Sequence, residues 1–458
     1  MPARVVFFYQ HFWPDSPPYA NLLRAIGAGL SSPGDVGSQR LVVDMLTAQP
    51  SYKATDRSRR LPAHELVERI SVTRLALLPG SSRFTPLRLL GKLLFPLRAL
   101  LVLIGRRLRG ERPDVIVAAT IPPVLNGLCA LMAAPIVGAR FVYHLQDVYP
   151  EIGAAAGLWP ERSLRHRVLR KLDTLVAQRA DRCVVLSDDM RDALIARGVP
   201  AEKVSIINNF MLEPFDPPEG RIVDRLNAGK VADLSESADG PEASSARRQL
   251  VFAGNLGRFQ ALETVLTAFL EHAANSDAFD LHFLGDGVVK DALLARAGDS
   301  SRVHFHGHVD FVEASRFIAR CDAGIVSIGE GVHRYAYPSK TLTYLGLGVP
   351  VFVLVETDSS LARDVREHDL GVTCGERSIE ALVDAFCALE RWLDSDADGE
   401  ASVRHYVEAH TASGTVIERW RDLLVDLSSP LEASTLAGPP ADSTRNDTSS
   451  IERLNRRE

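Results

Sequence analysis

The feature that most constrains the fold of this chain is an alternation of short apolar runs with segments of helical periodicity. Segments such as 262–274 place apolar residues at the 3.6-residue spacing of an amphipathic helix, whereas the apolar runs have the length of buried strands. This alternation is typical of βαβ units that build a parallel sheet. In the C-terminal half we expect strands at 249–255, 279–287, 302–309, 323–328 and 349–355.

The N-terminal half has the same rhythm, less regularly. Strands are expected at 4–10, 41–48, 114–120, 140–147 and 182–187. The segment between the halves is rich in Pro, Gly, Ser and charge, and the tail has the same composition, which favours disorder. We therefore predict a Rossmann-like domain at 1–212, a flexible linker or insertion at 213–247, a second Rossmann-like domain at 248–427 whose last helix can pack back on the first, and a disordered tail at 428–458.

Composition excludes several classes of function. The formal net charge of −6 leaves no excess of positive charge for nucleic acid as the principal partner. Five scattered cysteines form neither a disulfide framework nor a metal-binding spacing, which favours a reducing cytoplasm. The N-terminus lacks the features of a secretion signal, and the longest apolar stretch, 87–104, is interrupted by charged residues and Pro96. We expect a cytoplasmic α/β protein with two doubly wound domains facing across a cleft.

Two loops at the cleft-facing edge of the C-terminal sheet predict an anion site. Gly254 and Gly257 follow a strand and precede a helix, so backbone N–H groups there can approach a phosphate, beside the side chains of Asn255, Arg258 and Gln260. In "YPSKTLTYLGLG" we expect Ser339 to cap a helix and Lys340 to lie at its N-terminus, two strands further along the same edge. Because a lysine at that end of a helix is unfavourable without a counter-charge, the pair predicts a shared anion. The alternative is an ordinary solvated lysine.

A polar cluster is expected on the opposite wall of the cleft. In "YHLQDVYPE" (143–151), His144 and Asp147 end a buried strand of the N-terminal domain. We interpret them as groups that face the reactive end of a substrate, although a histidine at a strand end is often only a hydrogen-bonded core residue.

With these motifs the chain resembles the retaining nucleotide-sugar glycosyltransferases of family four, which have the GT-B architecture. The resemblance covers most of residues 4 to 425 and lies closest to the branch that builds bacterial cell-surface polysaccharides. It is carried by "YQHFWPDSPPYANLLRAI", "VDMLTAQPSY", "YHLQDVYPE", "VSIINNF", "FAGNLGRFQ", "FLGDG" and "PSKTLTYLGLGVPV".

The resemblance implies that the anion is the diphosphate of a nucleotide sugar, with a UDP-sugar favoured. Gly254, Gly257 and Lys340 match the residues that hold the diphosphate in the family, and His144 matches a histidine beside the transferred sugar. Retention is described there as a front-face displacement in which the leaving diphosphate helps to deprotonate the acceptor, so neither a metal nor another cofactor is expected. The expected acceptor is a growing glycan or one linked to a polyprenyl diphosphate.

The chain departs from the family pattern in three places. Tyr335 and Thr343 occupy the positions of two glutamates that contact the sugar and the ribose. Asn255 and Gln260 replace an arginine and a lysine, which leaves Lys340, with Arg258, as the main counter-charge. The segment 16–21 replaces a glycine pair, and its prolines cannot donate backbone N–H bonds to a phosphate.

Two further questions stay open from the sequence. The basic, amphipathic segment 86–109 and the basic stretch 162–171 are either solvated helix faces or docking surfaces for an anionic membrane. Two other functions also fit the expected fold: a nucleotide-sugar epimerase, which needs no acceptor, and a non-catalytic nucleotide-sugar-binding subunit.

Overall fold

The computed structural model describes residues 2–15, 17–32, 40–50, 60–76, 85–212, 247–395 and 399–429, the side chains of 85–93 and 259 excepted. The predicted linker, apart from Arg247, and the tail beyond Ser429 lie outside the described residues. In the described part of the chain, no helix combines the length and apolar character needed to span a bilayer.

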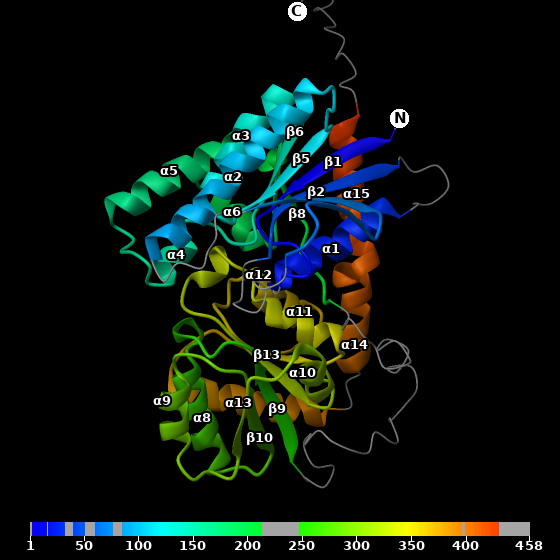
Figure 1. Ribbon diagram of the computed structural model, residues 1–458. Helices are drawn as coiled ribbons and strands as arrows, with labels where there is room; N and C mark the ends of the chain where they lie inside the picture. The colour runs from blue at the N-terminus through cyan, green and yellow to red at the C-terminus, as the bar shows by residue number, and fades with distance from the viewer. Residues whose placement is uncertain are drawn as a thin grey trace, which may run out of the picture. The chain divides into compact units, whose positions relative to one another are not determined.

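The N-terminal region is built on an eight-stranded sheet with the strand order β3-β4-β2-β1-β5-β6-β7-β8. Its strands β2, β1, β5 and β6 lie side by side in Figure 1. Every neighbouring pair is parallel except β3 and β4, which form an antiparallel hairpin. The sequence predicted five of these strands but not β3, β4 and β8. The strands are β1 (Ala3–Phe8), β2 (Leu41–Ala48), β3 (His64–Val67), β4 (Ile70–Leu75), β5 (Val115–Ala119), β6 (Arg140–His144), β7 (Arg182–Val185) and β8 (Val204–Ile206).

Helices cover both faces of this sheet, as a doubly wound fold requires. On one face lie α2 (Thr85–Leu108), α3 (Leu125–Val137), α5 (Leu164–Arg179) and α6 (Asp188–Ile195). On the other lie α1 (Pro18–Ser31) and the last described helix, α15 (Ser413–Ser428), which contacts α1, β1 and β5.

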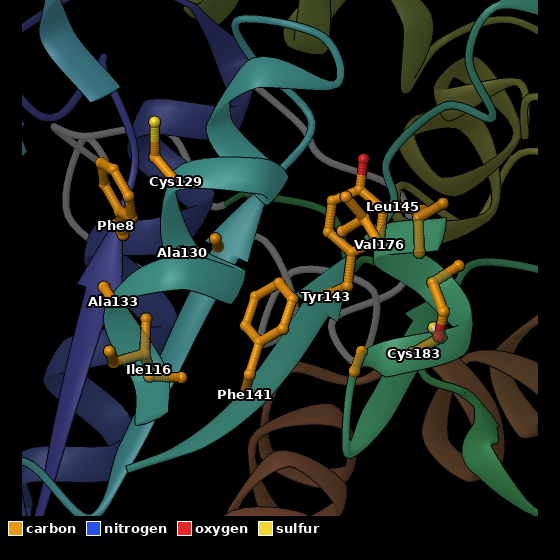
Figure 2. Close-up of a cluster of buried hydrophobic side chains, with 14 of the residues drawn as sticks. Phe8, Ile116, Cys129, Ala130, Ala133, Phe141, Tyr143, Leu145, Val176 and Cys183 are labelled. Carbon is orange, nitrogen blue, oxygen red and sulfur yellow. Dashed lines mark hydrogen bonds between the residues drawn. The ribbon is translucent and has the colours of Figure 1, made fainter. Parts of the chain in front are cut away.

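The first face shows how residue size sets the packing. Figure 2 shows the small side chains of α3, Cys129, Ala130 and Ala133, over the sheet residues Ile116 and Phe141. All five are almost fully buried. Small residues let the helix approach closely, and the larger sheet side chains fill the space between, which gives the packing density of a protein interior.

The C-terminal region is built on a six-stranded, wholly parallel sheet in the order β11-β10-β9-β12-β13-β14. Its strands are β9 (Arg248–Ala253), β10 (Phe279–Leu284), β11 (Val303–Gly307), β12 (Ala323–Ser327), β13 (Val351–Leu354) and β14 (Gly371–Cys374). The last of these was not predicted. The predicted α/β class, with two doubly wound sheets, is confirmed.

Helices again lie on both faces of the second sheet. One face packs against α8 (Leu262–Ala273), α9 (Lys290–Ala297) and α13 (Ile379–Asp394). The other packs against α10 (Phe311–Ile318), α11 (Ser339–Gly346), α12 (Ser360–Glu367) and α14 (Gly399–Tyr406). Because β9 and β12 are neighbours, the loops that follow them meet at the carboxyl edge of the sheet.

Candidate active site

A cavity of about 1220 Å³ lies where the carboxyl ends of the first sheet meet helix starts of the second. Ligands of doubly wound folds bind at this edge, where strand order reverses. In the first sheet the reversal falls between β1 and β5, and residues just beyond both strands line the cavity. Most of the lining is aromatic or aliphatic, as is usual in small-molecule sites. Its members include Tyr9, His11, Tyr19, Leu22, Thr120, Ile121, Asp147 and Phe210 from the N-terminal region and Phe311, Ser339, Leu342 and Thr343 from the C-terminal region.

The two loops predicted to share an anion are in contact. Gly254 follows β9 with φ +119°, and a Cβ atom there would lie 3.1 Å from Cε and 3.4 Å from Nζ of Lys340. The sequence placed Lys340 two strands away from the Gly254 loop, which is wrong, because β12, the strand before Lys340, pairs directly with β9, the strand before Gly254. Gly254 is therefore needed both for its backbone conformation and for the space that the lysine occupies.

Lys340 is a half-buried cation. It is the second residue of α11, and its Nζ lies 4.7 Å from the centroid of the Phe252 ring. Burial lowers its pKa from 10.5 to about 8. Among the described residues it forms no ion pair. A positive charge held at a helix N-terminus without a carboxylate is the arrangement expected of a site for an anion.

Of the other predicted side chains in the Gly254 loop, one stabilises the loop and two are exposed to solvent. Gln260 accepts a hydrogen bond from the Gly257 backbone N–H through Oε1 at 2.9 Å, so its side chain closes the loop. Asn255 and Arg258 are exposed, and Arg258 lines a second cavity of about 260 Å³ beside the start of α8. The loop also rests on the "FLGDG" turn, where Gly254 N–H donates to the Leu284 carbonyl at 2.7 Å.

The "PSK" turn differs from the prediction in one respect. Ser339 does not cap α11, because the helix begins at Ser339 and Pro338 occupies the cap position without a side-chain bond. Ser339 and Thr343 both line the large cavity. Tyr335, at the position of the first expected glutamate, accepts a bond from the Val148 N–H through its carbonyl at 2.7 Å and so ties this turn to the other wall.

His144 does not face the cavity, in contrast to the prediction. It is 1% exposed, and burial lowers its pKa to about 3, so the ring is neutral at physiological pH. Gln146 and Asn209 form a reciprocal amide pair, which leaves Gln146 Nε2 to donate to His144 Nε2 at 2.8 Å. The Nδ1–H then donates to the Tyr19 hydroxyl at 2.7 Å. His144 is one layer behind the lining residues Tyr19 and Gln146.

Asp147 does line the cavity. Burial raises its pKa from 3.8 to about 6, so the carboxylate is charged at neutral pH at a desolvation cost. Its side chain forms no hydrogen bond or ion pair with the described residues. Its backbone forms an isolated β-bridge with Ala336, four residues before Lys340. An unpaired carboxylate in such a wall can accept hydrogen bonds from substrate hydroxyls.

The rest of the "YHLQDVYPE" loop is held by a buried ionic network. Arg197 donates to the Tyr149 carbonyl and to Asp173, both at 3.0 Å, and also pairs with Glu151. Asp173 accepts a further bond from the Tyr143 hydroxyl at 2.7 Å. These groups fix the loop after β6 and explain the polarity of its last residue, Glu151, without a role in substrate binding.

Three features of the site were not predicted. Tyr19 joins His144 to the cavity, and His11 and Asp15 form a buried pair in the loop after β1. Asp189 of α6 accepts bonds from the Ser360 N–H and hydroxyl at the start of α12, which connects the two sheets' helices. Tyr19, His11 and Asp15 all lie in "YQHFWPDSPPYANLLRAI", one of the motifs that carried the family resemblance, so this motif was the sequence signal that could have identified them. Among the described residues, no group of His, Cys, Asp or Glu is arranged to hold a metal ion.

Comparisons with known proteins agree with this fold. Residues 37–209 match the glycosyl transferase 4-like domain. The probable glycosyltransferase WbjE of Pseudomonas aeruginosa is 27% identical over 291 residues, which cover 62% of this chain and 68% of that protein. HepE of Anabaena, solved in complex with UDP, superposes with a TM-score of 0.61 at 14% identity, covering 92% of this chain and 100% of that one. The lipopolysaccharide outer core galactosyltransferase WaaB superposes with a TM-score of 0.58 at 14% identity, covering 92% and 99%.

Proposed function

We propose that this chain, which has a GT-B fold and matches the glycosyl transferase 4-like domain over residues 37–209, is a glycosyltransferase that transfers a sugar from a UDP-sugar, with retention of configuration, to a lipid-linked or growing cell-surface glycan. The observation that carries this proposal is the position of Lys340 against Gly254: it is a half-buried cation with a lowered pKa that forms no ion pair with the described residues, and it lies beside a glycine loop. A diphosphate supplies the missing negative charge.

The proposed donor site assigns a role to each group around the diphosphate. Lys340 binds its oxygens, and the exposed Arg258 approaches from the loop's outer side. The N–H groups of Gly254 and Gly257 already donate to the Leu284 carbonyl and to Gln260 Oε1, so the glycines serve to let the loop pass close to the ligand. Ser339 and Thr343 lie on the cavity side of α11, where the ribose and sugar hydroxyls would bind. Uridine is favoured as the base because HepE, with the same fold, was solved with UDP.

The proposed transfer is a front-face displacement. The bond from the sugar's anomeric carbon to the phosphate oxygen breaks as the acceptor oxygen bonds to the same face, and the acceptor proton passes to the leaving diphosphate. Lys340 stabilises the charge that develops on that leaving group. Asp147 accepts hydrogen bonds from hydroxyls of the transferred sugar or acceptor, and His144 acts through Tyr19 as a positioning residue. The step requires neither a metal nor a further cofactor.

Calorimetric titration with UDP, GDP and ADP tests the donor site. We expect selective binding of UDP, and loss of binding in Lys340→Ala but not in Lys171→Ala, a matched change at an exposed lysine of α5. Absence of binding by all three nucleotides, or equal binding in Lys340→Ala, contradicts the assignment. Conversion of the UDP-sugar to an isomer without an acceptor would instead identify the epimerase.

We also propose that the outer surface of α2, α3 and α5 docks on an anionic bilayer. Eight of the fourteen large apolar side chains that are exposed in the described residues lie on these three helices. Eight Lys and Arg residues of these helices have described side chains, one of which, Arg106, pairs with the buried Asp44. The one acidic residue of the three helices, Asp173, is fully buried and paired with Arg197. In a chain of net charge −6 this surface combines apolar insertion with positive charge, as interfacial binding requires.

Sedimentation with phosphatidylcholine vesicles, with and without phosphatidylglycerol, tests this surface. We expect binding that needs the anionic lipid and falls with added salt. The pair Arg167→Glu and Lys171→Glu should weaken it by about tenfold or more, since each basic residue near such a surface contributes about 1 kcal/mol. Leu101→Gln should weaken it too, whereas Leu66→Gln, an equally exposed leucine on β3, should not. Binding that ignores these α2 and α5 changes would refute the docking surface.

A further inference from the structure

One carboxylate connects three loops at the carboxyl edge of the second sheet. Glu356, two residues beyond β13, lies between the loops that follow β12 and β14. Its Oε1 accepts a hydrogen bond from the Gly331 N–H at 2.7 Å and lies 3.3 Å from Arg377 Nη2, and its Oε2 lies 2.8 Å from His333 Nδ1. Arg377 also donates to the Ile328 carbonyl at 3.1 Å. The loops after all three strands therefore meet at Glu356.

These contacts favour the charged form of the Glu356 carboxylate. Burial raises its pKa, but the bonds from the Gly331 N–H and from its own backbone N–H, with the nearby Arg377 and His333 side chains, outweigh burial and hold the pKa below its usual value. A hydrogen bond to a charged acceptor is roughly twice as strong as one between neutral groups. Removal of the carboxylate would also leave the half-buried Gly331 N–H without its acceptor.

Glu356 holds the start of the segment 331–337. Gly331, at φ +69°, precedes a single 3-10 turn, η4 (Val332–Arg334), and His333 within this turn is buried. The turn packs against α6 of the N-terminal region. Because a backbone N–H and a side chain of the same short turn both meet one carboxylate, the position of the turn relative to β13 depends on Glu356.

The far end of the same segment contacts the loop that carries Asp147. The Tyr335 carbonyl accepts the bond from the Val148 N–H at 2.7 Å, and Ala336 forms the β-bridge with Asp147. Helix α11 follows directly, with Lys340 as its second residue. The segment thus connects the wall that holds Asp147 to the helix that holds Lys340.

We propose that Glu356 is a positioning residue that holds Asp147 opposite Lys340 by fixing the segment 331–337. This inference rests on the proposed glycosyltransferase function and adds to it a residue that does not line the large cavity. Without the carboxylate, the segment moves relative to β13 and the Val148 N–H loses a fixed partner. The Arg197 network still holds the later part of that loop, so the loosening is confined to its Asp147 end.

Hydrogen–deuterium exchange of the full chain, read by mass spectrometry, tests this connection without reference to activity. In Glu356→Ala the peptide that contains Val148 should exchange about tenfold faster or more, although the substitution lies in the other sheet. Glu356→Gln keeps an oxygen for the Gly331 N–H and should recover most of the protection. Glu367→Ala, which changes an exposed glutamate of α12, is the matched control and should leave this peptide unchanged.

Kinetics separate positioning from donor binding. UDP affinity in Glu356→Ala should change less than threefold, because Lys340 and the Gly254 loop both belong to the second sheet. The kcat for hydrolysis by water of the UDP-sugar that wild type accepts, among UDP-glucose, UDP-galactose and UDP-N-acetylglucosamine, should fall about tenfold or more, because Asp147 no longer faces the sugar. Glu356→Gln should restore most of this rate, and Glu367→Ala should match wild type.

Three outcomes overturn the inference. Unchanged exchange of the Val148 peptide in Glu356→Ala would show that Glu356 does not hold the opposite wall. Faster exchange in the peptides of both sheets, with a lower urea midpoint, would show a structural role alone, and so would equal effects of Glu356→Ala and Glu356→Gln. If Glu356→Ala does not fold, His333→Ala replaces it and should accelerate the same peptide to a smaller extent. Failure of wild type to bind any nucleotide would refute the donor site instead, and the exchange experiment would still decide the role of Glu356.

Discussion

Replacement of Lys340 by methionine should stabilise the protein while it removes nucleotide binding. Methionine is close to lysine in length and keeps the contact with Phe252 and Gly254, but it has no charge to desolvate. In the free protein the lysine is a cost to folding, because burial lowers its pKa and no carboxylate among the described residues compensates.

The magnitude follows from the pKa. A fall from 10.5 to about 8 corresponds to about 3 kcal/mol, since each pKa unit is about 1.4 kcal/mol. Partial solvent access and the lost cation–π contact reduce the gain, so we expect about 1–3 kcal/mol at pH 7. The folded-state pKa is the lower one, so the cost is complete below pH 8 and disappears as the pH rises from about 8 to 10.5. The stability advantage of the variant should shrink over the same range.

Urea denaturation at pH 7 and at pH 10, with UDP titration beside it, measures both effects. Lys171→Met, at an exposed position of α5, is the control and should change stability by less than about 0.5 kcal/mol. A destabilised Lys340→Met at pH 7 would show that the lysine is not a desolvated, unpaired cation. Unchanged UDP affinity in the same variant would refute the donor site.

Three further changes test the geometry around the site. Gly254→Ala should lower the free energy of unfolding by about 1–3 kcal/mol and weaken UDP binding at least tenfold, because φ is +119° and the new Cβ meets Lys340. The control Gly138→Ala, at a positive φ with open space around it, should lower stability without changing UDP affinity. Trp420→Ala should lower the free energy of unfolding by about 3–5 kcal/mol, since this 1% exposed side chain packs 4.8 Å from the His144 ring; an unchanged urea midpoint would refute that packing. Asp189→Ala should lower the free energy of unfolding by about 1–3 kcal/mol, because it removes the bonds from Ser360. The urea midpoint should fall in this variant but not in the control Asp192→Ala, which changes an exposed residue of the same helix.

Strand periodicity predicted the central strands of both sheets and the edge strand β11, but it missed the edge strands β3, β8 and β14 and the neighbouring strand β4. The run at 41–48 coincides with β2, because a central parallel strand is buried on both faces and reads as a continuous apolar run. The segment of β3 alternates two exposed residues with one half-buried and one buried residue, and β8 is only three residues long. Edge strands of this kind leave a weak apolar signal, so their detection needs the partner strand that the sequence does not identify.

The contents of the site were predictable where the chemistry is local, but not where it depends on packing. Gly254 and Lys340 were predicted from turn and helix-end chemistry, and their contact follows because their strands are neighbours. The burial of His144 was not predictable, because it depends on Tyr19 and on Trp420, whose α15 returns to the first sheet from the far end of the chain. Gln260 was expected at a phosphate, but its amide closes its own loop.

Asp147 and Lys340, which have no ion-pair partner among the described residues, each lower the stability of the protein over a different range of pH. Asp147 has a raised folded-state pKa, so its cost to stability appears as the pH rises from 3.8 to about 6 and is complete above that. The cost of Lys340 is complete below about 8. Between about pH 6 and 8 the free protein therefore holds both groups charged at their largest desolvation cost. A diphosphate at Lys340 and hydroxyl donors at Asp147 would relieve both, which converts folding free energy into affinity for donor and acceptor in the same neutral range. The double change Asp147→Asn and Lys340→Met should accordingly give a more stable protein at pH 7, with a flatter dependence of stability on pH, that binds neither ligand.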